Sequence, residues 1–302
     1  MSTQVLVKKA KTTGKPRNSR VVLLLLLPGI FYLGLFFITP FVSLITTSLQ
    51  APVLGGGIGV YQPGLEFGNY VFVVTEYFDQ IIRSFIYATL ATLLALAISY
   101  PIAYFIAVKA RNRPVLQALL LTLVIAPFFI SFLLRTFAWK QVFSQNSWLS
   151  NILRDTGLMA DDQFLLGSSF AVVFGLTYNF IPFMTLPLYT NLERLDTALL
   201  EAGSDLYATP TSTFWKVTFP LSIPGITSGT LLTFIPIAGD FVTASGSFLG
   251  TPSTSMIGNV IEANYITIQD FPSASALSVL LMAAIVVLVS VYIRRTGTED
   301  LL

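Results

Sequence analysis

The sequence contains no cysteine and no histidine, and only 11% of its 302 residues are charged. The absence of cysteine excludes disulfides and thiolate chemistry, and the absence of histidine excludes Ser-His catalysis and His-ligated metal sites. Soluble domains are about one quarter charged, whereas this chain is 54% hydrophobic and has a mean hydropathy of +0.75. The composition therefore predicts a membrane protein. The net charge of +2, spread over short loops, gives no reason to expect a nucleic-acid partner.

Long apolar runs, by contrast, are plentiful. A membrane-spanning helix needs about 20 mostly apolar residues, and six stretches meet this need: roughly 20–48, 84–108, 115–137, 169–190, 222–246 and 274–293. The sequence thus predicts an all-α polytopic membrane protein with six transmembrane helices. The first stretch is too long for the apolar core of a signal peptide and shows no small-residue cleavage pattern before Pro40, so we interpret it as a retained helix.

The placement of lysine and arginine predicts the orientation, because cytoplasmic loops carry an excess of both. With the N-terminus inside, 13 of the 17 basic residues are cytoplasmic: Lys8, Lys9, Lys11, Lys15, Arg17, Arg20, Lys109, Arg111, Arg113, Arg194, Lys216, Arg294 and Arg295. We therefore expect a basic cytoplasmic tail at 1–19, a membrane domain at 20–295 with a cytoplasmic loop at 191–221, and a cytoplasmic tail at 296–302. The basic tail follows from this topology alone, and recognition of membrane lipid is the alternative.

No phosphate-binding motif of the type G-x-x-x-x-G-K-[ST] occurs, so the chain cannot hydrolyse ATP by the usual P-loop route. If ATP drives transport, another subunit must hydrolyse it. No internal repeat is evident, which disfavours a self-contained secondary transporter, since the halves of such proteins often show inverted symmetry. An intramembrane hydrolase is disfavoured as well, because only a Ser–Lys or a carboxylate pair would remain as its nucleophile and base.

A polar segment at 193–225 interrupts the apolar stretches and is typical of two short helices with a break between them. Asp196 or Thr197 can cap the first helix. The pair Thr209-Pro210 restarts a helix, with Thr as the cap and Pro at the first helical position, where its missing N–H costs little. Pro224-Gly225 then ends or kinks the chain as it returns to the membrane. The same pattern also fits an interfacial anchor on the membrane surface.

This segment resembles the cytoplasmic EAA loop of binding-protein-dependent ABC importer permeases, the MetI-like family. The family pattern reads E-A-A, three residues, G-A, a hydrophobic position and a closing L-P, and the matching residues are Glu201, Ala202, Ala208, Phe214 and Pro220. Two positions depart from it: Gly203 stands where the second Ala is usual, and Tyr207 where the Gly is usual. A glycine there permits a tight turn with positive φ, so either Tyr207 adopts that conformation at a cost or the turn is more open.

Four further segments resemble the spermidine/putrescine permease branch of this family. They are Leu134–Trp139, Ile181–Tyr189, Gly239–Thr243 and Met256–Asn259, and they extend the resemblance over roughly residues 20–295. The resemblance implies a type I ABC importer permease (MetI-like) fold in the bacterial inner membrane and transport by alternating access. It also implies polyamine as the cargo, with another small solute as the alternative.

The resemblance implies three kinds of protein partner as well: a second, similar permease, a pair of ATPase subunits, and an extracytoplasmic substrate-binding protein. ATP and Mg²⁺ would be bound by the ATPase, and no cofactor is expected on this chain. Glu201 would fix the loop in a groove of the ATPase, and Phe214 would fill that groove. We refer to residues 191–221 as the coupling loop.

Asp240, in the fifth apolar stretch, is the candidate charge of the transport path, because an ionised carboxylate in the membrane costs several kcal/mol unless it is paired or faces water. It could attract a polyammonium cargo or be structural, neutralised by Arg135 or solvated by backbone N–H groups at Gly239. It also leaves open an ion-coupled secondary transporter. Aromatic rings could line a cation path, each contributing about 0.5–2 kcal/mol, or could pack the helices together. The candidate rings are Trp139, Tyr178 and Phe183.

Overall fold

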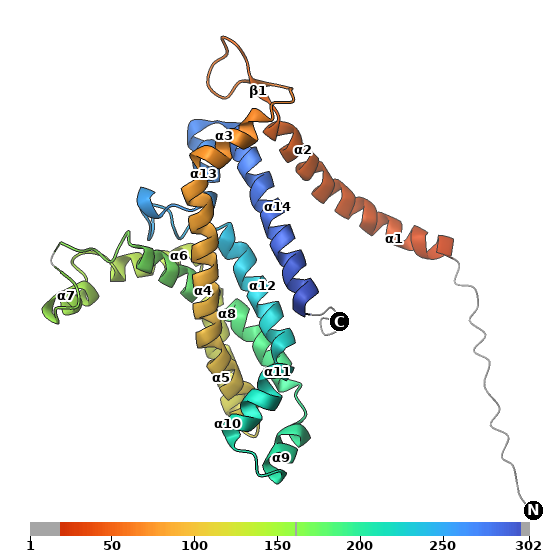
Figure 1. Ribbon diagram of the computed structural model, residues 1–302, viewed down its shortest axis with the longest axis vertical. Helices are drawn as coiled ribbons and strands as arrows, with labels where there is room; N and C mark the ends of the chain where they lie inside the picture. The colour runs from red at the N-terminus through yellow and green to blue at the C-terminus, as the bar shows by residue number, and fades with distance from the viewer. Residues whose placement is uncertain (1–18, 161, 297–302) are drawn as a thin grey trace, which may run out of the picture.

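The computed structural model describes residues 19–160 and 162–296 (Figure 1). The predicted tails at 1–19 and 296–302 therefore lie outside the described residues, apart from Ser19 and Thr296. The described chain is predominantly helical, and a short antiparallel ribbon pairs β1 (Ala51–Pro52) with β2 (Tyr61–Gln62). The all-α prediction is confirmed.

The helices fall into three groups by length and type. The longer ones are α1 (Ser19–Leu33), α2 (Thr39–Ser48), α4 (Phe78–Tyr104), α5 (Pro114–Ile125), α6 (Phe132–Val142), α8 (Ser169–Glu193), α12 (Ile223–Ala238) and α14 (Phe271–Thr296). The shorter ones are α3 (Gly68–Glu76), α7 (Trp148–Asp155), α9 (Thr197–Asp205), α10 (Pro210–Thr213), α11 (Phe219–Leu221) and α13 (Ile257–Glu262). Wider π-helical turns are η1 (Gly34–Ile38), η2 (Phe105–Lys109), η4 (Phe214–Thr218) and η6 (Ala263–Ile268), and tighter 3-10 turns are η3 (Ala126–Phe129) and η5 (Pro252–Thr254).

Four of the six predicted spans are continuous helical segments. In the described chain, Leu24–Ser48, Phe78–Lys109, Ser169–Glu193 and Phe271–Arg294 are long and apolar enough to cross a membrane. Two bent pairs of helices raise the number to six if each pair crosses as one broken span. The multi-pass architecture is therefore confirmed, with four to six crossings by length and composition.

The third predicted span, at 115–137, is wrong as a single helix. Helix α5 and η3 are followed by extended residues at Ile130 and Ser131, and α6 then leaves at 91° to the first part. Pro127 lies at the start of η3, and a proline removes a backbone donor and disfavours continuation of a helix. Apolar composition continues through this bend, which is why hydropathy alone merged the two parts.

The fifth predicted span, at 222–246, is too long at its C-terminal end. Helix α12 ends at Ala238, and it is bent by 60° from the preceding segment Pro210–Leu221. The residues from 239 to 246 form turns, bends and irregular chain. Asp240 thus follows the fifth helix instead of lying within it.

Helices α4, α8 and α12 form the centre of the molecule and contact one another. Tyr87 of α4 donates a hydrogen bond to the Ser169 hydroxyl of α8 at 2.6 Å, and Ser99 donates to the carbonyl of Ile181 at 3.3 Å. In both pairs the α8 residue lies 82 positions after its α4 partner. The two helices therefore advance in the same direction and run parallel. Such contacts matter in lipid, where helices associate by close packing and hydrogen bonds because water expulsion gives little.

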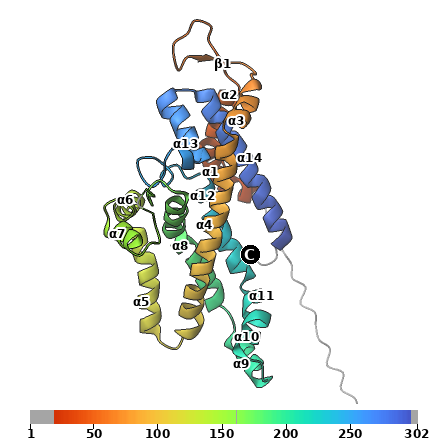
Figure 2. The same ribbon diagram turned by 60° about the vertical axis from the view of Figure 1, so that its left-hand side comes forward.

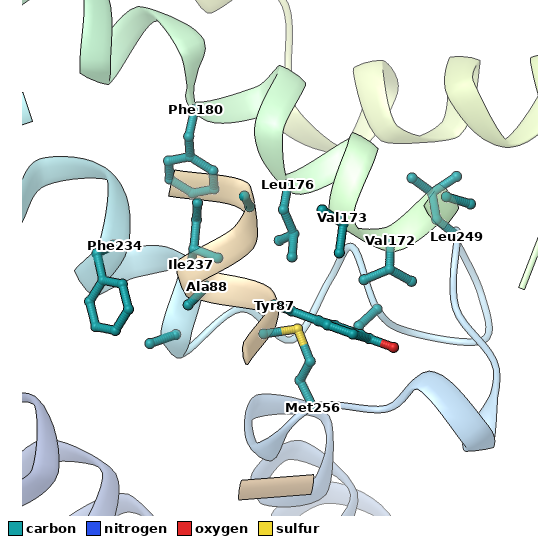
Figure 3. Close-up of a cluster of buried hydrophobic side chains, with 14 of the residues drawn as sticks. Tyr87, Ala88, Val172, Val173, Leu176, Phe180, Phe234, Ile237, Leu249 and Met256 are labelled. Carbon is teal, nitrogen blue, oxygen red and sulfur yellow. The ribbon is translucent and has the colours of Figure 1, made fainter. Parts of the chain in front are cut away.

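A buried apolar cluster joins these three helices to the segment that follows α12 (Figure 3). Its members include Tyr87 and Ala88 of α4, Val172, Val173, Leu176 and Phe180 of α8, Phe234 and Ile237 of α12, and Leu249 and Met256 beyond α12. This cluster fixes the position of the Asp240 segment against α8.

The two ends of the molecule differ in what they carry (Figures 1 and 2). One end carries α3, α13 and the β-ribbon, and the opposite end carries α9, α10 and α11. Helix α2 contacts α14, and α1, joined to α2 by η1, extends away from the other helices.

Candidate functional site

The coupling loop begins with a capped helix directly after α8. The backbone N–H of Ala198 donates to Asp196 Oδ1 at 2.9 Å, so Asp196, one of the two capping residues that the sequence left open, supplies the cap. Helix α9 follows and carries Glu201 and Ala202, both exposed. The local sequence was sufficient here because the cap acts within two residues.

The turn after α9 keeps the tight geometry that glycine usually provides. Tyr207 has a φ of +58°, and the N–H of Ala208 donates to the carbonyl of Gly203 at 3.0 Å. A bond from the residue that follows the left-handed one, here the third residue after the helix, back to a carbonyl of the last helical turn is the Schellman arrangement of helix ends. A left-handed conformation costs a non-glycine residue roughly 1–2 kcal/mol. The alternative of a more open turn is wrong.

The second departure from the family pattern has a steric explanation. A Cβ atom built on Gly203 would lie 2.9 Å from Oγ1 and 3.1 Å from Cγ2 of Thr213. Helices α9 and α10 contact each other here, and the usual alanine would require Thr213 to move. Gly203 therefore permits the close approach of the two short helices.

Helix α10 starts as predicted. The Thr209 hydroxyl accepts a hydrogen bond from the N–H of Ser212 at 3.3 Å, and Pro210 is the first helical residue. The chain continues through η4 and α11, where Pro220 is exposed, and then bends into α12.

Phe214 faces the helices of its own chain. Its half-buried ring lies edge-on to the rings of Tyr100 and Tyr104 of α4, with centroid distances of 5.7 and 5.6 Å. The Tyr100 hydroxyl in turn bonds Ser222 at 2.8 Å. This placement does not fit the expected role of filling a groove on a partner, because Phe214 instead anchors the coupling loop to α4.

The outward surface of the loop is acidic and apolar. Leu206 is 81% exposed and Tyr207 96% exposed, beside exposed Glu201 on α9. Large side chains exposed together near a charge mark a surface that another protein can cover. This surface, made of Glu201, Ala202, Leu206 and Tyr207, is the candidate docking surface.

Asp240, the candidate charge of the path, is satisfied within its own segment. Its Oδ1 accepts from the backbone N–H of Thr243 at 2.7 Å, and its Oδ2 accepts from the Thr243 hydroxyl at 3.2 Å. A Cβ on Gly258 would lie 2.5 Å from the carbonyl oxygen of Asp240, so α13 packs closely against this turn. The backbone and hydroxyl donors come from Thr243 and not from Gly239, and the described residues form no ion pair between Asp240 and Arg135.

Arg135 is buried without a partner among the described residues. Only 7% of it is exposed, its Nε and Nη1 make no hydrogen bond, and its guanidinium carbon lies 5.9 Å from the centroid of the Phe132 ring. Nearby, Asn179 donates to the Thr136 hydroxyl at 3.1 Å while its own Oδ1 has no partner. Uncompensated buried polar groups are costly. The unpaired groups of Arg135 and Asn179 could therefore form hydrogen bonds with a further polar group between α6 and α8.

The predicted aromatic residues fall into two clusters. Trp139 packs against Tyr178 and Phe174, with centroid distances of 5.3 and 4.5 Å. Phe183 packs against Phe128 and Phe180, at 5.3 and 5.6 Å. The structure does not bring these residues together around Asp240, and contacts between α6 and α8 account for the position of Trp139.

A groove between α8 and α12 was not predicted from the sequence. It has a volume of about 450 Å³ and contains Phe183, together with the polar residues Thr190, Asn191, Arg194 and Ser228. Asn191 Oδ1 is buried and has no hydrogen-bond partner in the described chain. The spacing Phe183, Pro187, Thr190 and Arg194 follows one face of a helix, and this periodicity is the signal that could have revealed the groove.

Comparison with known proteins identifies close relatives, although no protein-family model matches the chain. The spermidine/putrescine transport system permease protein PotB of Haemophilus influenzae is 34% identical over 239 residues, covering 79% of this chain and 82% of that protein. PotB of Escherichia coli is 35% identical over 221 residues, covering 73% and 78%. The inner membrane ABC transporter permease YdcU of Escherichia coli is 28% identical over 236 residues, covering 74% of each chain.

Solved structures share the fold. A chain of a bacterial ABC transporter that imports alginate superposes with a TM-score of 0.67 at 17% identity, covering 92% of this chain and 95% of that one. A chain of the inward-facing methionine transporter MetNI gives a TM-score of 0.52 at 18% identity, covering 74% and 92%.

The fold, the membrane-spanning helices and the relatives of 34–35% identity define a permease subunit of an ABC importer, a multi-pass protein of the inner membrane. Within that class, the chain belongs to the PotB family of permeases. An ion-coupled secondary transporter, which the sequence left open, belongs to a different class of protein, so membership of the PotB family argues against that alternative.

Proposed function

We propose that the chain is the permease subunit of an ATP-driven importer of polyamines such as spermidine and putrescine. The observation that carries this proposal is the identity of 34–35%, over most of the chain, to permeases named for spermidine/putrescine transport. The chain would translocate the cargo by alternating access and would not itself hydrolyse ATP.

The partners follow from the same class. The chain would pair with a second, similar permease, with an ATPase dimer that binds ATP and Mg²⁺, and with an extracytoplasmic substrate-binding protein. The alginate importer has been solved with a periplasmic protein bound, which supports the last of these. Both termini and the coupling loop would be cytoplasmic, in keeping with the distribution of lysine and arginine.

The candidate docking surface would contact the ATPase. Glu201 would form a charge-assisted contact there, and Leu206 and Tyr207 would be buried by the partner. Phe214, which packs on Tyr100 and Tyr104, would transmit movement of the loop to α4. Pro220 would set the bend at which the loop returns to the membrane.

The groove between α8 and α12, which reaches the start of the coupling loop at Asn191 and Arg194, would form the cytoplasmic end of the path, where the charge of Arg194 would help to release a cation. The unpartnered Oδ1 of Asn191 and the hydroxyls of Thr190 and Ser228 are acceptors suited to an ammonium group. Phe183 would offer a ring face to the same group. Asp240 would act mainly by holding the segment after α12 in place, because Thr243 already occupies both of its oxygens.

The test is uptake of labelled spermidine in cells deleted for this gene and for redundant polyamine systems, complemented with wild type, Glu201→Gln or Glu201→Arg. We expect wild type to restore uptake. The Arg variant should lower both uptake and ATPase copurification by about tenfold or more, as for a charged residue central to an interface, and Gln should be intermediate. Uptake that is unaffected by deletion would refute the polyamine cargo, and normal copurification with Glu201→Arg would refute the docking surface.

One observation favours a second candidate cargo. A buried guanidinium that no carboxylate of residues 19–160 or 162–296 pairs with, as in Arg135, suits a solute that carries an anionic group better than a pure polycation. Zwitterionic solutes should then compete with labelled spermidine more strongly than putrescine does. If putrescine competes better, the polyamine assignment stands.

A further inference from the structure

Arg111 connects two segments that are far apart in the sequence and lie at the same end of the molecule. It lies in the short connection between η2 and α5, at the end of the molecule that carries the coupling loop. Its Nη2 donates to the carbonyl of Glu193 at 3.0 Å, and its Nη1 donates to the carbonyl of Leu195 at 2.9 Å. The acceptors are the last residue of α8 and a residue of the link between α8 and α9.

These carbonyls need an external donor. The last carbonyls of a helix have no intrahelical N–H partner, and they carry the negative end of the helix dipole. A guanidinium presents two donors in a fixed fork and a positive charge, so it satisfies both needs at once. Leu195 directly precedes Asp196, the cap of α9. Arg111 therefore holds the junction at which the coupling loop leaves the membrane domain.

A second set of contacts attaches the same junction to α5. Gln117 Nε2 donates to the Tyr189 hydroxyl at 3.1 Å and to Glu193 Oε1 at 3.3 Å. Tyr189 also donates to that carboxylate oxygen. Glu193 is thus held through its backbone by Arg111 and through its side chain by Gln117 and Tyr189.

We propose that Arg111 is a positioning residue of the transport cycle, which locks the α8–α9 junction to the α4–α5 connection so that displacement of the coupling loop moves α5 together with α8. The proposal rests on the proposed function, since it needs an ATPase that displaces the loop. Without this lock, the link between Glu193 and Asp196 would act as a hinge and absorb the displacement. Nothing in the family resemblance assigned a role to Arg111.

The chain offers a matched control. Arg113 lies two residues away in the same connection and carries the same charge, but it is exposed and its side chain makes no hydrogen bond or ion pair with the described residues. Replacement of either arginine by glutamine lowers the positive charge of this connection equally. Effects on membrane topology should therefore be the same, and only the loss of the Arg111 contacts should differ.

The test uses single cysteines in the complete transporter, which the cysteine-free chain allows once the partner subunits are also cysteine-free. Asp205→Cys reports on α9, and Val115→Cys reports on the start of α5, where the native side chain is 81% exposed. The rate of labelling by a water-soluble maleimide is measured with and without ATP. This readout does not depend on knowing the cargo.

We expect ATP to change the labelling rate at both positions when Arg111 is present. With Arg111→Gln, the response of Asp205→Cys should persist while that of Val115→Cys falls severalfold, because only the Gln117 contacts with Tyr189 and Glu193 then join α5 to the junction. Arg113→Gln should leave both responses unchanged, and Arg111→Lys should restore part of the response. Spermidine uptake per assembled complex should fall in the same order.

An unchanged response of Val115→Cys in Arg111→Gln would overturn the proposal while leaving the proposed function intact. A response lost equally in Arg113→Gln would overturn it too, because charge alone would then be the cause. If neither cysteine responds to ATP with both arginines present, docking of the coupling loop itself is refuted, and the proposal with it.

Discussion

Gly203→Ala restores the residue that is usual in the family, and we expect it to destabilise this particular loop. The new Cβ would lie 2.9 Å from Thr213 Oγ1, and such overpacking costs typically about 1–3 kcal/mol. Alanine regains about 1 kcal/mol of helix propensity over glycine. The net expectation is a loss of about 0–2 kcal/mol in the local stability of α9 and its turn, as the difference of these two effects.

The assay is hydrogen exchange at the Ala208 amide, which bonds the Gly203 carbonyl and so reports on the turn. A loss of 1 kcal/mol would speed exchange about fivefold if exchange follows local opening. Gly29→Ala is the control, because a Cβ there meets nothing within 4 Å. Gly29→Ala should gain local helix stability from the higher helix propensity of alanine alone.

The double variant Gly203→Ala with Thr213→Ala separates sterics from propensity. Removing the Thr213 side chain beyond Cβ removes the clash, so the double variant should exchange more slowly than Gly203→Ala alone. A coupling energy of about 1–3 kcal/mol is expected from overpacking of two residues in contact. Slower exchange in Gly203→Ala alone than in wild type would refute the steric explanation.

Three further predictions concern strained or unpartnered groups. Tyr207→Gly should slow hydrogen exchange at the Ala208 amide severalfold, because it relieves about 1–2 kcal/mol of left-handed strain. Faster exchange would contradict the strain. Weaker ATPase copurification with the same variant would show that the Tyr207 ring contacts the partner. In Asp240→Asn the amide oxygen can still accept from the Thr243 N–H, whereas Asp240→Ala leaves this donor unpaired at a cost of about 1–3 kcal/mol. Only the Ala variant should therefore lower the melting temperature markedly. Equal melting temperatures of the two variants would show that these bonds do not hold the segment. Arg135→Met should not destabilise the isolated chain, because it removes a buried charge that has no partner, and a clear loss in its thermal unfolding would reveal a favourable contact of the guanidinium.

Local features were predictable from the sequence because their causes act over a few residues. The apolar stretches, the lack of a P-loop, the cap at Asp196 and the restart at Thr209-Pro210 all depend on neighbouring residues or on composition. The resemblance to ABC importer permeases depended on ordered local motifs, and it agrees with the family to which the chain belongs. For the same reason, the sequence identified Tyr207 as the position where the turn would be strained, although it left the form of the turn open.

Features that depend on distant contacts were decided only by the tertiary structure. Hydropathy does not register the 91° bend between η3 and α6, because apolar residues continue through it. Phe214 turns inward because two tyrosines of α4 receive its ring, and Asp240 needs no arginine because its own turn supplies the donors. Arg111 reaches carbonyls 82 and 84 residues away. A linear pattern records which groups a chain carries, but the partner of a buried or strained group is set by packing between elements, and that packing appears only when the chain is folded.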